Sequence, residues 1–72
     1  MSKNVWRYYL PYRPPMPGAQ PREGLDRVAS FEQRQQFDGV GCWGYAEYTR
    51  ELSDDEVRQY ELIASKNNPL EY

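Results

Sequence analysis

The sequence contains no histidine and a single cysteine among its 72 residues. Histidine is the commonest metal ligand and the commonest general base near neutral pH, so its absence removes both roles. One cysteine cannot form a disulfide within the chain, nor a zinc site of the usual four-ligand type. Cys42 lies inside a strand pattern, with no histidine to activate it. We therefore expect no metal, no cofactor and no enzyme activity.

Long apolar runs are missing too. No stretch approaches the roughly 20 apolar residues that a membrane-spanning helix needs. The N-terminal residues lack the apolar run of a signal peptide, and an unpaired cysteine suits a reducing compartment. These absences predict a cytoplasmic protein that does not act at a membrane.

The net charge is only −2, but it is distributed unevenly. Residues 1–36 hold six cationic and three anionic side chains, whereas residues 37–72 hold three and eight. The two halves could lie side by side and neutralise each other, or the first half could present a basic face to an anionic partner. The cations are spread out, and no block of lysine and arginine indicates a nucleic-acid-binding tail.

Aromatic residues are what this chain has in surplus. A chain of this length forms one domain at most and buries only about 60% of its unfolded surface. Each large aromatic side chain can bury about 150–250 Å², so these residues must supply the packing. Residues 5–10 and 40–48 hold both tryptophans. Their aromatic content and alternation predict two strands that decide the fold.

Both predicted strands have two distinct faces. In the first, Trp6 and Tyr8 point one way while Arg7 and Tyr9 point the other, so one face could be a binding surface. The second strand carries mostly small residues on the face of Ala46, which leaves room for a bulky group to pack there.

Residues 13–24 form the clearest loop, with four prolines and two glycines. Proline fixes φ and cannot continue a helix, so the loop is stiff. The PxxP spacing from Pro14 to Pro17 can also adopt a polyproline II helix that docks in an aromatic groove. The segment is therefore either a rigid connector or a docking segment.

The rest of the chain supplies the other elements. Residues 25–31 favour a short strand, and 31–37 favour a turn or two of helix. Ser53 followed by Glu56 forms a capping box, which predicts a helix from Asp54. The pattern of residues 60–64 fits either a helix or a last strand. The predicted core comprises Trp6, Tyr8, Leu10, Val28, Phe31, Trp43, Tyr45, Leu52, Val57, Tyr60 and Ile63.

Together these patterns predict an α+β fold in which a small antiparallel sheet of three to four strands packs with one helix. Residues 1–64 would form a single small domain, and residues 65–72 a flexible C-terminal tail.

Four stretches carry a resemblance to known proteins. Residues 6–10, 12–21, 44–48 and 51–53 look like a family of short uncharacterised bacterial proteins carried by prophages and conjugative elements. The resemblance covers about residues 5–64. It implies a bacterial or phage context in the cytoplasm, and it implies no activity.

The function that these patterns favour is a non-enzymatic protein-interaction module that binds a protein partner or a second copy of itself. The alternative is a single-stranded nucleic-acid-binding protein, in which tyrosines stack on bases beside arginines; the acidic net charge argues against it. In either case the candidate binding residues are Arg7, Tyr9, Tyr12, Arg13, Pro14, Pro15, Met16 and Pro17.

Overall fold

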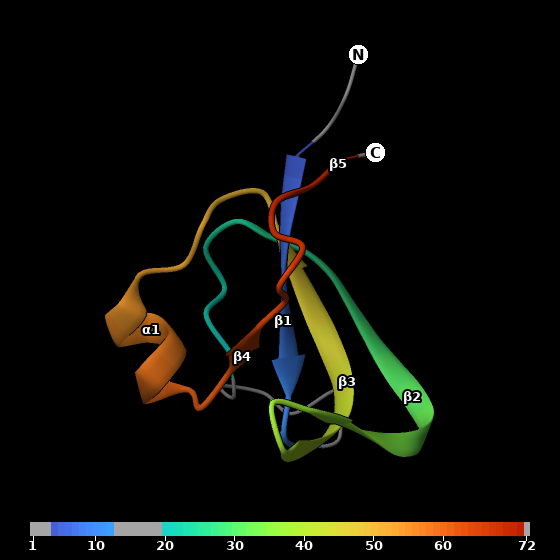
Figure 1. Cartoon of the computed structure of the whole chain (residues 1–72). Coiled ribbons are helices and arrows are strands. Elements are labelled where there is room, and N and C mark those ends of the chain that lie inside the picture. The colour runs from blue at the N-terminus through green and yellow to red at the C-terminus, as the bar shows by residue number, and fades with distance from the viewer. Residues whose placement is uncertain (1–3, 13–19, 72) are drawn as a thin grey trace.

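The computed structural model describes residues 4–12 and 20–71. Within these residues five strands form an antiparallel sheet, and one helix, α1 (Asp54–Gln59), lies beside it (Figure 1). The strands are β1 (Asn4–Leu10), β2 (Leu25–Phe37), β3 (Val40–Tyr48), β4 (Ile63–Ala64) and β5 (Leu70–Glu71). Their order across the sheet is β2-β3-β1-β4, and β5 also pairs with β1.

The antiparallel sheet and the helix from Asp54 that the sequence predicts are both present. The sheet has one strand more than expected, and α1 is only six residues long. Strands therefore dominate the described residues, and the α+β description fits the fold only loosely.

The helix expected over residues 31–37 is wrong, because these residues continue β2. Asp38 and Gly39 have φ values of 52° and 78°, as the two central residues of a type I′ turn require. This turn directs the chain straight back into β3, so that Phe37 lies opposite Val40. Pairing with β3 therefore overrides the weak helical pattern.

An irregularity in β2 bends this hairpin. Six residues on β2, from Ser30 to Gln35, match only three on β3, from Gly44 to Cys42. Extra residues on one strand bend it and increase its twist. As a result the hairpin tip curls back toward β1 and β4, and Asp38 at the tip lies 3.3 Å from the Lys66 ammonium.

The core lies on the face of the sheet toward α1. Tyr8 packs edge-to-face on Tyr48, with ring centroids 5.9 Å apart. The small side chain of Ala46, opposite Tyr8 in the register, leaves room for these rings, as the sequence indicates. The buried cluster comprises Tyr8, Leu10, Ala46, Tyr48, Leu52 and Leu62.

Part of the predicted core is therefore confirmed. Tyr8, Leu10 and Leu52 are buried, and Trp6, Val28, Val57 and Tyr60 pack against them while remaining partly exposed. Phe31 and Tyr45 instead contact each other in a second aromatic cluster with Tyr9 and Phe37. Among the described residues, the buried hydrophobic core also includes five residues that the prediction lacks: Val5, Cys42, Ala46, Tyr48 and Leu62.

Both ends of α1 are capped. At its start the capping box is confirmed: the Ser53 hydroxyl accepts from the Glu56 N–H, and the Glu56 carboxylate accepts from the Ser53 N–H. At its end the Leu62 N–H donates to Val57 and the Glu61 N–H donates to Arg58, which is a Schellman motif. The chain then enters β4, so residues 60–64 end in a strand rather than in more helix.

Residues 65–71, which belong to the segment that the sequence predicts as a flexible tail, run back along β1. The Asn68 side-chain amide accepts from the Arg7 N–H at 2.8 Å and donates to the Arg7 carbonyl at 2.9 Å. It thus satisfies the backbone of β1 between β4 and β5, and Leu70 then pairs with Val5. Among the described residues, no helix has the length and apolar character to cross a membrane.

Candidate functional site

Opposite the core, the sheet carries a second aromatic cluster, which we call the outer aromatic face: Arg7, Tyr9, Phe31, Phe37 and Tyr45. The Tyr9 and Phe37 rings stack at 3.6 Å between centroids with an interplanar angle of 6°. Phe31 lies 5.8 Å from Tyr45 and 6.0 Å from Phe37. All five side chains are partly exposed, so the face remains accessible at its centre.

The register of the sheet brings these residues together. Tyr9 lies opposite Tyr45, and Arg7 lies opposite Glu47, so two aromatic residues and an ion pair occupy neighbouring cross-strand positions. Phe31 and Phe37 come from β2, and the bend in β2 carries Phe37 over to Tyr9.

The Arg7 guanidinium is held on two sides. Its Nε and Nη2 atoms donate to Glu47 Oε2 at 2.9 and 2.6 Å, and its central carbon lies 4.3 Å from the centre of the Tyr45 ring. Glu47 is only 2% exposed, so its carboxylate depends on this pairing. The arginine therefore has a fixed position and presents a stacked planar cation beside the rings.

The structure brings together two of the predicted site residues, Arg7 and Tyr9. Tyr12 does not join them: it packs against the buried core, and burial raises the pKa of its phenol to about 12. The remaining predicted residues, Arg13, Pro14, Pro15, Met16 and Pro17, lie outside the described residues.

Sequence reasoning did not assign Phe31, Phe37 and Tyr45 to the site. The spacing of the two phenylalanines gives no dependable signal, because the irregularity between Ser30 and Gln35 interrupts the alternation of faces along β2. The helix expected over residues 31–37 also separates them from the strand pattern. Tyr45 was assigned to the core because a strand pattern alone does not indicate which face is covered.

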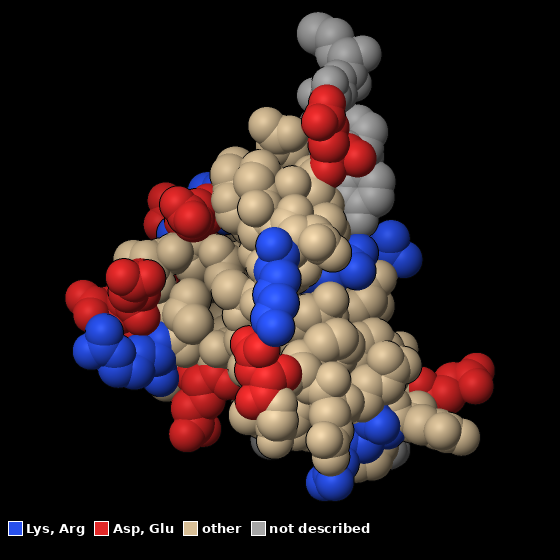
Figure 2. Space-filling model, viewed as in Figure 1, with Lys and Arg blue, Asp and Glu red and all other residues tan. Residues whose placement is uncertain are grey.

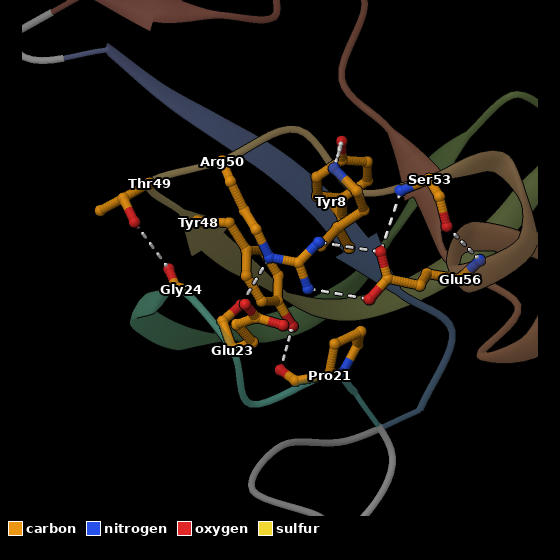
Figure 3. A network of polar contacts seen from close by, with 10 residues as sticks. Tyr8, Pro21, Glu23, Gly24, Tyr48, Thr49, Arg50, Ser53 and Glu56 are labelled. Carbon is orange, nitrogen blue, oxygen red and sulfur yellow. Dashed lines mark hydrogen bonds and ion pairs between the residues drawn. The ribbon is translucent and has the colours of Figure 1, made fainter.

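A polar network lies on the other side of the molecule, where the β3–α1 segment meets the residues before β2 (Figure 3). Arg50 donates to both Glu56 oxygens, at 2.9 and 2.8 Å, and to the Glu23 carbonyl at 2.9 Å. The hydrogen bonds from Arg50 and from the Ser53 backbone lower the pKa of Glu56 to about 2.

Two buried tyrosines extend this network. The Tyr48 hydroxyl donates to the Pro21 carbonyl at 2.7 Å, and the Tyr8 hydroxyl accepts from the Leu52 N–H at 2.9 Å. Burial raises the pKa of both phenols. Each of these contacts gives a hydrogen-bond partner to a backbone group or pairs a charged side chain. The network therefore holds the β3–α1 segment against the residues before β2.

A reactive thiol and a metal-binding cluster are two kinds of chemical group that could act in a site. Cys42 is fully buried, and burial raises the pKa of its thiol, which favours the unreactive protonated form. No group of three or more cysteine, aspartate or glutamate side chains gathers where it could hold a metal within residues 4–12 and 20–71.

Fold and site thus define a small, mostly β domain with an aromatic face around a fixed arginine. A family model described as Defence against restriction A C-terminal matches residues 3–67, and the chain belongs to this family. The family is associated with bacteria and their phages, which agrees with the context that the resemblance implied. No curated protein and no solved structure matched the chain.

Proposed function

We propose that this domain is a non-enzymatic protein-binding module and that the outer aromatic face carries the contact. The observation that supports this most directly is the set of partly exposed rings packed around Arg7. Tyrosine and arginine are enriched among residues that dominate binding energy at protein interfaces. Because the rings are already stacked, little side-chain freedom would be lost on binding.

The state of Arg7 favours a protein partner over a nucleic acid. Its charge is compensated by Glu47 at 2.6 Å, and the chain as a whole is acidic. Single-stranded nucleic acids are held in positively charged grooves, whose binding is strongly salt-dependent. A paired arginine on an aromatic ring instead suits apolar contact and hydrogen bonding to a protein surface.

The family description supports a biological setting for this contact. Its wording connects the family with defence against restriction. We therefore propose that the domain binds a bacterial or phage protein, or a second copy of itself, in the cytoplasm, and that this contact serves the protection of DNA from restriction. The proline-rich residues 13–17 remain a proposed second part of the contact surface.

The contact is tested by affinity capture from a bacterial lysate with three proteins: wild type, Tyr9→Ala and Leu25→Ala. Leu25 packs against the core rather than on the outer aromatic face, so its variant controls for lost packing. Thermal melts first establish that both variants are folded. Tyr9→Ala should lose partners that wild type and Leu25→Ala retain; equal recovery by all three would contradict the proposed surface.

Two further measurements separate the parts of the proposal. Titration of labelled oligonucleotides at low and moderate salt should detect no binding at micromolar protein; salt-sensitive binding would favour the nucleic-acid alternative. Expression of the domain should raise the efficiency with which unmodified plasmid transforms a restricting host, measured relative to the efficiency in a non-restricting host. If the domain captures a partner but does not change the transformation efficiency, the proposed role against restriction is wrong, while the proposed binding function is retained.

A further inference from the structure

A groove lies between α1, β4 and the start of β3, on a different surface from the outer aromatic face. Its volume is about 730 Å³, which is large for a domain of this size. We call it the α1 groove. Its apolar lining consists of Pro11, Val40, Val57, Leu62 and Ile63, and charged residues Asp54, Arg58 and Glu61 lie at its rim. Val40 is the large apolar side chain that the described residues expose, at 41%.

The helix that forms one wall does not fill the groove. None of the six residues of α1 is buried, and its apolar residue Val57 stays partly exposed. A helix this short is marginal unless something holds it. Here the capping box, the Arg50–Glu56 ion pair at 2.8 Å and the Schellman motif hold it from its ends. Val57 packs against the core while remaining partly exposed, so part of its side chain is available to another molecule.

The rim of the groove is acidic. Its charged lining consists of two carboxylates, Asp54 and Glu61, and one cation, Arg58. The Arg58 guanidinium also lies 4.0 Å from the Asp55 carboxylate, an exposed neighbour on the helix. Figure 2 shows several acidic side chains over α1, with basic side chains beside them. The potential at the groove therefore favours a cationic ligand.

Glu61 is one of the two carboxylates in the lining. Its φ of 56° places it in the left-handed region, at the position of the Schellman motif that glycine usually occupies. The groove thus has a carboxylate where the backbone would favour glycine.

We propose that the α1 groove docks a segment of a partner protein in which apolar side chains alternate with lysine or arginine. The apolar side chain enters between Val40, Val57 and Ile63, and the flanking cations lie beside Asp54 and Glu61. The inference goes beyond the proposed function, because it assigns a second surface and the chemistry of its occupant, and it does not require the outer aromatic face.

The first test is a fluorescence polarisation titration with a labelled peptide of alternating leucine and lysine. Two matched peptides serve as controls, one with serine in place of leucine and one with glutamate in place of lysine. We expect the leucine–lysine peptide to bind at least about tenfold more tightly than either control. No binding at millimolar peptide, or equal binding of the glutamate peptide, would overturn the proposal.

The second test uses variants of the domain. Glu61→Gln should lower the affinity for the peptide by about two- to fivefold, because one exposed ion pair is lost. Val40→Ser should weaken it by about tenfold through lost apolar contact. Glu32→Gln, an exposed carboxylate on β2 away from the groove, should leave the affinity unchanged. Circular dichroism checks that each variant is folded; if all three bind like wild type, the groove is not the site.

Backbone amide NMR locates the bound peptide. Shifts confined to residues 54–63 and the neighbourhood of Val40 support the proposal, whereas shifts centred on Tyr9 and Phe37 would overturn it. Light scattering of the isolated domain tests the competing occupant, a second copy of this chain. A dimer that Val40→Ser dissociates would assign the groove to self-association and overturn the proposed partner.

Discussion

Glu47 carries a carboxylate in the middle of the sheet with 2% of its surface exposed. A buried charge is tolerated when a partner and hydrogen bonds replace its hydration. Arg7 provides both, through two nitrogens within 2.9 Å, and is itself fixed by the Tyr45 ring. The Arg7–Glu47 ion pair therefore helps to fix the geometry of the outer aromatic face.

Removing Arg7 should destabilise the fold more than a surface substitution does. Arg7→Met removes the guanidinium that pairs with the buried Glu47 carboxylate, which we expect to cost about 3 kcal/mol of unfolding free energy. Urea denaturation measures this. Arg58→Met is the matched control, since Arg58 is 79% exposed and its loss should change stability by less than about 0.5 kcal/mol. Equal effects of the two variants would contradict the structural role of the pair.

A substitution at Glu61 should instead stabilise the fold. Glu61→Gly should raise the free energy of unfolding by about 1 kcal/mol, because glycine adopts a positive φ without steric cost. Glu51→Gly, at an exposed position outside the left-handed region, should give no such gain. Thermal denaturation compares the two. A destabilised Glu61→Gly variant would show that the glutamate side chain itself supports the fold.

At the scale of elements, α1 is held by charge more than by burial. The hydrogen bonds from Arg50 and Ser53 lower the pKa of Glu56 to about 2, from about 4.5 in the unfolded chain. A carboxyl group with a lowered folded pKa contributes stability above its unfolded pKa and loses it as the pH falls. The contribution is therefore complete above about pH 4.5 and is lost progressively toward pH 2.

Glu56→Gln tests this assignment. The variant should be less stable than wild type near pH 7, and the difference should shrink as the pH falls from about 4.5 toward 2. Urea midpoints across that pH range measure it, with Glu32→Gln as a control that should keep the pH dependence of the wild type. A difference between wild type and Glu56→Gln that is constant with pH would contradict the role of this ion pair.

Some elements could be predicted from the sequence better than others. The start of α1 was predictable because Ser53, Glu56 and the acidic first turn are local signals, and the structure uses all of them. The second half of β2 was not, because its polar run has no clear period of either kind. What makes it a strand is non-local: pairing with β3 and the stack of Phe37 on Tyr9.

For the molecule as a whole, the sequence predicted which residues supply the packing but not which face they cover. Tyr8 and Tyr9 are neighbours of the same kind, yet one lies in the core and the other on the outer aromatic face. The predicted core does not include Tyr48, although this residue is completely buried. Its burial depends on a partner distant in sequence, the carbonyl of Pro21, and no local pattern indicates such a contact.

These buried phenols make the whole fold sensitive to high pH. Burial raises the pKa of Tyr12 to about 12 and raises those of Tyr8 and Tyr48 as well. In the unfolded chain the three ionise near pH 10. Because the folded state favours their neutral form, its stability is complete below about pH 10 and falls as the pH rises further.

We therefore expect cooperative unfolding above about pH 10, followed in parallel by tyrosinate absorbance and by circular dichroism. The late-ionising phenols should titrate together with the loss of structure, because ionisation requires exposure of the rings to water. Tyr12→Phe removes one of the three groups and should move the transition to higher pH, whereas Tyr9→Phe, on the outer aromatic face, should leave it in place. Complete ionisation of all tyrosines near pH 10 in a domain that stays folded would mean that the core is open to solvent, contrary to the packing of Tyr8 against Tyr48.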